Sequence, residues 1–528
     1  MKKVISLCLI ICIIVSFCSC TIGVSNIQLT VGTLDEIVTL DPLYADGDGE
    51  KIIAANCFEG LLRYDEEGNI DLAGATAYTT GKGAFSYTFK LNPSAKWYIP
   101  KNVKTTLDSV GITDFREEIT AADYIYGIKR FFRMGRTELS SIKGYAEFMA
   151  DNKTAQLGLK AIDDYTLEIT LAKADPDFLY KLATMPVYPC REEFCDALEG
   201  IFYTTPATAL CNGPYYIKEV SQTQSVIEKN PEYNGNIQVK NKSIVLYATG
   251  QKSALISRFA DGSYDVFVAT NMEKPEDFTP SYSSVNGTWG FAFNCNSEMG
   301  KLPELRNILL SSIDYDKIKL PDFATLKADR IIPDNFTVFN KAYSSFNPQK
   351  SGYKVNKETA QKNIDTLLNK LSKESLTIKF SIPAELEKSM ETVISTWQTL
   401  FEDKIIFDVK VFETAYMDEI VSDSDYDLAI LPLKPLRRTA SGVIEAISGA
   451  HCYYSDKKIA TLAKQAISDE KTASANYSKI EKLIVDSGVF VPLFFATNDL
   501  YENEDVSGIY TADGGNLIYF HGGEIIEE

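Results

Sequence analysis

The sequence predicts an α/β protein with more than one lobe, and three observations lead to that prediction. The chain has 528 residues, which is more than one hydrophobic core supports, because single cores stop growing at about 250–300 residues. Strand-like alternation of apolar and polar residues recurs along the chain, and segments with helical periodicity lie between the alternating segments. Strands interspersed with helices favour layered α/β lobes.

Three segments show the alternating pattern most clearly. In each of them every second residue is apolar, which predicts a strand with one face half-buried against a core. They are Phe85–Leu91, Leu167–Leu171 and Leu376–Ile382.

Helices are predicted between such strands. The segment Thr120-Ala-Ala-Asp123 has the form of a capping box, and apolar residues follow it at helical spacing. A second helix is expected to begin at Pro303, since proline favours the first turn. A third is expected over residues 387–401, where Trp397 is predicted to be a core residue.

The charge balance argues against nucleic acid as a partner. The chain has 72 acidic and 53 basic residues, a net charge of −19, and no cluster of lysine and arginine long enough to follow a phosphate backbone. We interpret the acidic excess as a solvated surface that keeps the protein soluble.

The first 20 residues predict export. Two lysines precede an apolar run over residues 4–17, which is shorter than the about 20 residues of a membrane-spanning helix. Residues 17–20 then resemble a bacterial lipobox, in which a cysteine is diacylated and becomes the new N-terminus. We expect Cys20 to be the lipid anchor. Cys18 is the alternative acceptor, and a plainly cleaved secretory signal is the other interpretation.

The cysteines after this segment form no CxxC pair, so the sequence indicates neither a zinc site nor a redox motif. Export permits disulfides, and we expect buried free thiols or one or two bridges whose pairing the spacing does not define. These cysteines are Cys57, Cys190, Cys195, Cys211, Cys295 and Cys452.

Several separated segments resemble, in order, the motifs of one family. The first half of the chain matches its "LDP", "YEGL", "YTFKLR", "KW" and "TAEDV" motifs at Leu40-Asp41-Pro42, Phe58–Leu61, Tyr87–Leu91, Lys96-Trp97 and Thr120–Asp123. Further along, the chain matches "KR", "GTGPY", "KNPDYW", "GEIDV" and "IPLY" at Lys129-Arg130, Asn212–Tyr216, Lys229–Tyr233, Asp261–Val266 and Val491–Leu493. The chain thereby resembles the extracellular solute-binding proteins of family 5, the oligopeptide-, dipeptide- and nickel-binding receptors of ABC importers.

The resemblance implies the fold in more detail. We expect a two-lobed clamshell like that of the periplasmic binding proteins, of type II in its large form, with an extra inserted domain. The base lobe is expected to be discontinuous, over 27–57, 185–290 and 489–528. The inserted domain is expected over 58–184, and the opposing lobe over 291–488.

The resemblance also implies a function. We expect an extracytoplasmic, lipid-anchored substrate-binding protein that captures a small peptide or peptide-like solute by hinge closure and delivers it to the permease subunits of an ABC importer. A ligand that touches both lobes binds the closed state more tightly and shifts the population towards it. A monomer is expected, with no membrane contact except the lipid anchor.

Candidate ligand contacts follow from the same resemblance. They lie in the loop after the first strand, at the lobe crossing and in the loop 431–441, and they are Tyr44, Asp46, Trp289, Phe291, Lys434, Arg437 and Arg438. Peptide-binding members carry an aspartate in the last of these loops that pairs with the ligand's α-amino group, and no acid matches it here. The basic residues favour an anionic group instead, such as a C-terminal carboxylate. Turn, core or solvated roles are the alternatives.

Enzymatic chemistry is not expected. The chain has no G-x-S-x-G, H-E-x-x-H or Walker A motif, and its only histidines are His451 and His521. Residues 46–50 place acids at alternate positions like a calcium loop, but Lys51 and Cys57 stand where an EF-hand needs glycine and glutamate. No cofactor and no metal are therefore expected. A sensory or adhesive surface lipoprotein and an exported hydrolase are the alternative functions.

Overall fold

The computed structural model describes most of the chain after the predicted leader. The described residues are 27–150, 156–270, 275, 277–321, 323–339, 341–346, 348, 355–413, 416–433, 435, 438–449 and 452–526. The predictions for Cys18, Cys20, Lys434, Arg437 and His451 lie outside them. Within these ranges, none of the helices combines the length and the apolar character needed to cross a membrane.

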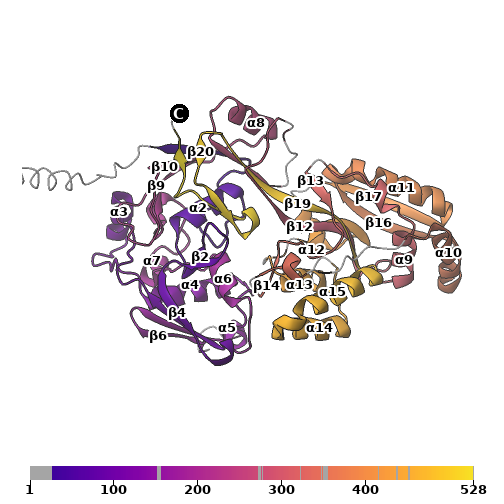
Figure 1. The fold of residues 1–528 in the computed structure, drawn as a ribbon, viewed down its shortest axis with the longest axis horizontal. Helices are drawn as coiled ribbons and strands as arrows, with labels where there is room; N and C mark the ends of the chain where they lie inside the picture. Colours follow the sequence, from indigo (N-terminus) through magenta and orange to yellow (C-terminus); the bar gives the residue numbers. More distant parts are fainter. Residues whose placement is uncertain are drawn as a thin grey trace, which may run out of the picture.

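One sheet of eleven strands runs through two lobes (Figure 1). Its two longest strands, β12 (Tyr282–Phe293) and β19 (Phe490–Glu502), lie antiparallel at its centre and extend from one lobe to the other. The strands on one side of this pair are β11 (Val266–Thr270), β1 (Gln28–Thr33), β10 (Ser243–Ala248), β9 (Gln224–Lys229) and β8 (Tyr215–Val220). Those on the other side are β18 (Leu428–Leu433), β16 (Leu376–Pro383) and β17 (Ile405–Phe412), and β13 (Ala324–Lys327) pairs with β19. The prediction of α/β lobes is confirmed.

We define the first lobe as the part built around β1 and β8–β11. Its helices are α2 (Asp48–Cys57), α3 (Lys101–Ser109), α4 (Ala121–Arg133), α5 (Tyr145–Ala150), α6 (Phe178–Thr184), α7 (Glu192–Ala197) and α8 (Lys252–Ala260). Its smaller strands are β2 (Leu62–Tyr64), β3 (Ile70–Leu72), β20 (Val506–Ser507), β21 (Tyr510–Ala512), β22 (Leu517–Tyr519) and β23 (Glu524–Ile525).

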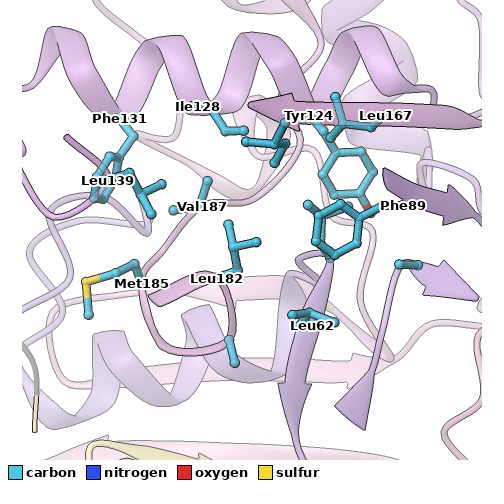
Figure 2. Packing of buried hydrophobic residues seen from close by; sticks show 14 of the residues in the cluster. Leu62, Phe89, Tyr124, Ile128, Phe131, Leu139, Leu167, Leu182, Met185 and Val187 are labelled. Atoms are coloured by element: carbon cyan, nitrogen blue, oxygen red, sulfur yellow. The ribbon is translucent and has the colours of Figure 1, made fainter. Parts of the chain in front are cut away.

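A separate antiparallel sheet belongs to this lobe, in the order β4 (Ala75–Thr80), β5 (Ser86–Leu91), β7 (Thr166–Thr170) and β6 (Leu159–Asp163). Two of the predicted strands, β5 and β7, are neighbours in it. The helix α4 begins at the predicted capping box, where Asp123 accepts a hydrogen bond from the Thr120 amide. Figure 2 shows Ile128 and Phe131 of this helix packed in one apolar cluster with Leu182 and Val187.

The second lobe is built around β16–β18. Its helices are α9 (Pro303–Ser311), α10 (Lys357–Leu371), α11 (Glu387–Phe401), α12 (Met417–Asp423), α13 (Ala440–Ser448), α14 (Lys457–Ser468) and α15 (Glu470–Ser487), and β14 (Thr337–Val338) pairs with β15 (Lys341–Ala342). Trp397 of α11 is fully buried, as predicted, and its indole Nε1 donates to the Leu309 carbonyl at 3.1 Å. The predicted strand at β16 and the predicted helices at α9 and α11 are confirmed.

Several of the matched motifs touch one another in the first lobe. Asn212 exchanges two hydrogen bonds with the backbone of Glu59, at 3.0 and 2.8 Å. Asn230 donates to the Gly213 carbonyl at 3.0 Å, and Arg130 donates to the carboxylate of Asp41 at 3.0 Å. The motif residues therefore connect, by hydrogen bonds, segments that are distant in the sequence.

The C-terminal segment returns to the first lobe, and one buried histidine lies in it. Asn56 of α2 donates to the Ile518 carbonyl and accepts from the Phe520 amide. His521 follows directly, and its ring lies 5.3 Å from that of Tyr510 between centroids. Burial, together with the charge of Arg63, lowers the pKa of His521 to about 4.

This burial predicts an acid-sensitive stability. An unfolded histidine titrates near pH 6.5, so the unfolded chain takes up a proton before the folded one does. The free energy of unfolding should therefore fall between about pH 6.5 and about pH 4, by about 3 kcal/mol from this group. In urea unfolding at pH 7 and pH 4.5, His521→Phe should lose about 2–3 kcal/mol less than the wild type. Equal losses in the two proteins would contradict this prediction.

Candidate ligand-binding cleft

A cavity of about 360 Å³ lies where the two lobes meet. Its size falls within the usual range of small-molecule sites. The first lobe and the crossing strands supply most of its lining, and Pro435 reaches it from the second lobe. The lining residues are Pro42, Leu43, Ala45, Asp46, Lys51, Ala54, Arg136, Thr184, Met185, Pro186, Tyr188, Thr270, Asn286, Pro435, Asn498, Asp513, Asn516 and Leu517.

Other hollows lie on the surface of the first lobe near α3, with volumes of about 450 and 720 Å³. Each is lined by residues of that lobe alone. A ligand bound there would make no contact that differs between open and closed lobes, so it would not drive closure. The cavity between the lobes is therefore the candidate site.

A buried carboxylate holds in place the loop that forms one side of this cavity. Glu50, in the first turn of α2, accepts hydrogen bonds from the amides of Val38, Thr39, Asp46 and Gly47 at 2.8–3.3 Å. A carboxylate at a helix N-terminus is also favoured by the helix dipole. The loop that carries the predicted contacts Tyr44 and Asp46 is therefore fixed from beneath by one side chain.

Only one of these two predicted residues lines the cavity. Asp46 does, and its carboxylate lies 3.8 Å from the ammonium of Lys51. Tyr44 is not in the lining and is 55% exposed to solvent. Its hydroxyl donates to the sulfur of Met134 at 3.1 Å. Asp46 is thus in a position to meet a ligand, whereas Tyr44 lies on the surface in this conformation.

The two predicted aromatic contacts are core residues of the second lobe. Trp289 is 2% exposed and packs against Phe323 and Phe494, and Phe291 is fully buried with its ring centroid 6.0 Å from that of Trp397. The two residues are two positions apart on β12 and so face the same side of the strand. Neither side chain is in the lining of the cavity, and a contact of either residue with ligand stays a prediction.

Two asparagines that the sequence reasoning missed face the cavity from the crossing strands. Asn286 lies at an irregularity in the pairing of β12 with β19, and its amide donates to Asn498. Asn498 donates in turn to the Gly514 carbonyl at 3.1 Å. No distinct signal in the sequence marked them, because both crossing segments contain other polar residues, such as Ser284 and Thr497.

Arg438 joins the lobes instead of lining the cavity. It is 7% exposed. Its backbone amide donates to the Tyr180 hydroxyl of the first lobe at 3.1 Å, and its guanidinium donates to Ser284 and to the Val285 carbonyl of β12. The Tyr180 hydroxyl also donates to Asp513. In this conformation the guanidinium is engaged by protein groups and not offered to a ligand.

The turn at Asp513 is shaped around this arginine. Asp513 and Gly514 both have positive φ, of 46° and 65°, and a non-glycine residue in this region is strained. A Cβ added to Gly514 would lie 1.7 Å from the Arg438 guanidinium, so only glycine fits there. Burial raises the pKa of the Asp513 carboxyl, and the charge of Arg438 opposes that effect.

A second contact crosses between the lobes beside the first. Ser441, at the start of α13, donates to the carboxylate of Asp177 at 2.8 Å. Asp177 directly precedes α6 of the first lobe. Together with Arg438, this bond holds the lobes against each other, so the structure represents a closed arrangement.

The charges around the cavity are of both signs. Lys51 and Arg136 supply cations, and Asp46 and Asp513 supply carboxylates. Arg136 lies 3.0 Å from the carboxylate of Glu138. The described residues contain no group of three or more potential ligands that could hold a metal ion. The cavity thus offers charged and amide groups for binding.

Comparison with known proteins places the chain in a family. The model of the bacterial extracellular solute-binding proteins, family 5 Middle, matches residues 70–435. The match covers more than half of the chain, so the chain belongs to the bacterial extracellular solute-binding proteins of family 5, as the motifs predicted.

Individual relatives are distant. The oligopeptide-binding protein AmiA of Streptococcus pneumoniae is 27% identical over 237 residues, which are 43% of this chain and 34% of AmiA. The chain therefore matches only about a third of that relative's length. The periplasmic murein peptide-binding protein MppA of Escherichia coli is 24% identical over 506 residues, covering 88% of this chain and 87% of MppA.

Solved structures confirm the two-lobed fold. Listeria monocytogenes OppA bound to peptide superposes with a TM-score of 0.74 at 20% identity, covering 96% of this chain and 100% of that chain. One structure of MppA gives a TM-score of 0.74, and its unliganded open form gives 0.68.

The contacts of Arg438 predict its effect on closure. Arg438→Ala keeps the backbone bond to Tyr180 and removes the guanidinium bonds to Ser284 and Val285. Hydrogen bonds from charged groups contribute about 1.5–3 kcal/mol each, so the variant should shift the ratio of closed to open ligand-free protein by at least about tenfold towards open. Small-angle X-ray scattering should then report a larger radius of gyration.

The matched control is Arg330→Ala. Arg330 is also buried in the second lobe, but its ion pairs are with Asp329 and Asp334 of the same lobe. This variant should lose stability without an increase in the radius of gyration of the folded protein. An equal increase in both variants would show that Arg438 has no specific role in closure.

Proposed function

We propose that this chain is the substrate-binding protein of an ABC importer, and that it captures a small peptide or peptide-like solute between its lobes. The observation that carries the proposal is a cavity at the junction of two lobes that share the strands β12 and β19. Relatives named as oligopeptide- and murein peptide-binding proteins support the ligand class. No covalent chemistry is part of the proposal.

Closure is the proposed link between capture and delivery. A ligand held by the first lobe and by the loop 431–441 makes more contacts in the closed state than in the open one. Its differential affinity then sets the closed population. The permease subunits of the importer would recognise that closed shape, and a ligand touching one lobe alone would not produce it.

The polar groups of the cavity suggest how a zwitterionic ligand would bind. Lys51 and Arg136 are placed to receive a carboxylate, and Asp46 is placed to receive an amine. Lys434 and Arg437 remain proposed contacts from the second lobe, on the strength of the sequence. Trp289 and Arg438 are proposed to act indirectly, by supporting the crossing strand and the closed arrangement.

The domain organisation is proposed as the sequence predicts it. The first lobe would combine a base lobe over 27–57, 185–290 and 489–528 with an inserted domain over 58–184. The second lobe would be the opposing lobe over 291–488. We further propose a monomer exported through the segment 1–20 and held at the outer face of a membrane by a lipid on Cys20.

A binding screen tests the ligand class. Peptides of graded length, free amino acids and sugars should be compared by thermal shift and calorimetry, because a ligand specific for the folded state raises its stability. Peptides should raise the melting temperature. At a peptide concentration of 100 Kd, the free energy of unfolding should increase by about 2.7 kcal/mol. Stabilisation by sugars alone, or by no compound in a folded sample, would refute the proposed ligand class.

Lys51→Met tests the placement of the ligand's carboxylate. We expect this variant to bind a peptide with a free C-terminus at least about fivefold more weakly, and a C-terminally amidated peptide about as well as the wild type does. Lys82→Met is the matched control, since Lys82 lies in the turn before β5, outside the cavity. If Lys51→Met kept the wild-type preference for peptides with a free carboxylate, Lys51 would not be a contact of that carboxylate.

The anchor has its own test. In a bacterial host fed a labelled fatty acid, the wild type should carry the label and fractionate with membranes. Cys20→Ser should lose both properties, whereas Cys18→Ser should keep them. A label lost only in Cys18→Ser would move the anchor to Cys18, and no label in the wild type would indicate a plainly cleaved signal.

A further inference from the structure

The six cysteines of the described chain lie in three neighbouring pairs. All six are free thiols in this structure. We propose that they form three disulfides in the exported protein, and that each disulfide lies within a single lobe. The pairs are Cys57 with Cys211, Cys190 with Cys195, and Cys295 with Cys452.

The pair in the second lobe is defined by its backbone. The amide of Cys295 donates to the carbonyl of Cys452 at 3.0 Å. Such a bond brings the two backbones into direct contact, which is compatible with the 4.4–6.8 Å between Cα atoms in disulfides. Burial raises the pKa of Cys452, and the Cys295 thiol lies close enough to act in the same direction. Cys295 lies two residues after the end of β12, and Cys452 lies between α13 and α14, so a bond here would tie the helical layer to the crossing strand.

The pair Cys57 and Cys211 joins two distant segments of the first lobe. Both side chains are buried in the same apolar cluster. Burial raises the pKa of Cys57, and the Cys211 thiol is near enough to raise it further. The Gly213 amide donates to the Cys57 carbonyl at 2.9 Å, and a Cβ on Gly213 would lie 2.7 Å from the carbonyl carbon of Cys57. The segment that carries Cys211 therefore runs directly beside Cys57.

The third pair is local. Cys190 lies two residues before α7 and Cys195 ends the first turn of that helix, and each thiol shifts the pKa of the other. The hydrogen bond from Cys195 lowers the pKa of Cys190, and the nearby Arg130 guanidinium acts in the same direction. A thiolate is the nucleophile in disulfide exchange, and Cys195 is the partly exposed member of this pair.

The pairing of every cysteine favours disulfides over buried thiols. If the six thiols were unrelated and scattered through two lobes, at least one of them would be expected to lie without a cysteine neighbour. The argument rests on the proposed function in one respect, because disulfides persist outside the cytoplasm. None of the pairs joins the two lobes, so the bonds would stiffen each lobe and leave closure free.

The chemistry requires an external oxidant. A cysteine thiolate attacks the disulfide of an extracytoplasmic thiol oxidant, either a protein or a small-molecule disulfide, and releases one thiol from it. The second cysteine then displaces the other half of the oxidant from the mixed disulfide. Each bond thus transfers two electrons and two protons, and the oxidant leaves as two thiols.

The test is made on the full chain exported by an oxidising bacterial host. The protein is denatured, alkylated without reductant and digested, and its linked peptides are identified by mass spectrometry. Three linked peptides, joining 57 to 211, 190 to 195 and 295 to 452, are expected. Six alkylated cysteines in a folded exported sample, or linkage in another pattern, would overturn the proposal.

A single variant provides a sharper measurement. Cys57→Ser should make Cys211 reactive to alkylation and leave the other four cysteines protected, and its melting temperature should fall by at least about 5 °C. The melting temperature of the double variant, Cys57→Ser with Cys211→Ser, should fall by a similar amount. Reactivity spread over all remaining cysteines would contradict separate pairs. Peptide binding measured on the oxidised wild type reports on the proposed function independently.

Discussion

The pairing of β12 with β19 is the constraint on which the rest of the structure depends. Ten residue pairs join these strands, and the register shifts twice, between Val285 and Gly287 and between Trp289 and Gly290. Such irregularities bend a strand and increase its local twist. The first shift coincides with Asn286, which lines the cavity. The pairing that connects the lobes is thus irregular, and expected to bend, where a ligand would lie.

Closure must be balanced for such a protein to respond to its ligand. If the contacts of Arg438 and Ser441 closed the lobes completely, a ligand would have no population to shift. These contacts are few, and both lie beside the cavity and not inside it. Their position lets them add to the contacts of a bound solute without occupying its place, so the protein and the ligand stabilise the same state.

The sequence predicted elements well and side-chain placement less well, for a physical reason. A capping box or an alternating strand is a local pattern, so α4, β5 and β16 could be recognised from their own residues. Whether Trp289 faces a cleft or a core depends on what covers each face of β12, which is set by distant segments. The pairing of Asn286 with Asn498 depends in the same way on the register of two strands far apart in the chain.

Most of the motifs that identified the family hold distant segments of the chain together by hydrogen bonds. This structural role explains why they did not identify the ligand. Asp41 holds Arg130, Asn212 holds the backbone of Glu59, and Asn230 holds Gly213. A buried polar group must keep its partner, because leaving one unsatisfied costs about 1–3 kcal/mol. Residues in contact with ligand are under no such internal constraint, and the loop 431–441 departs from the family pattern where a ligand contact was expected. Family membership therefore follows from how the lobes are assembled, whereas specificity must be determined at the cavity itself.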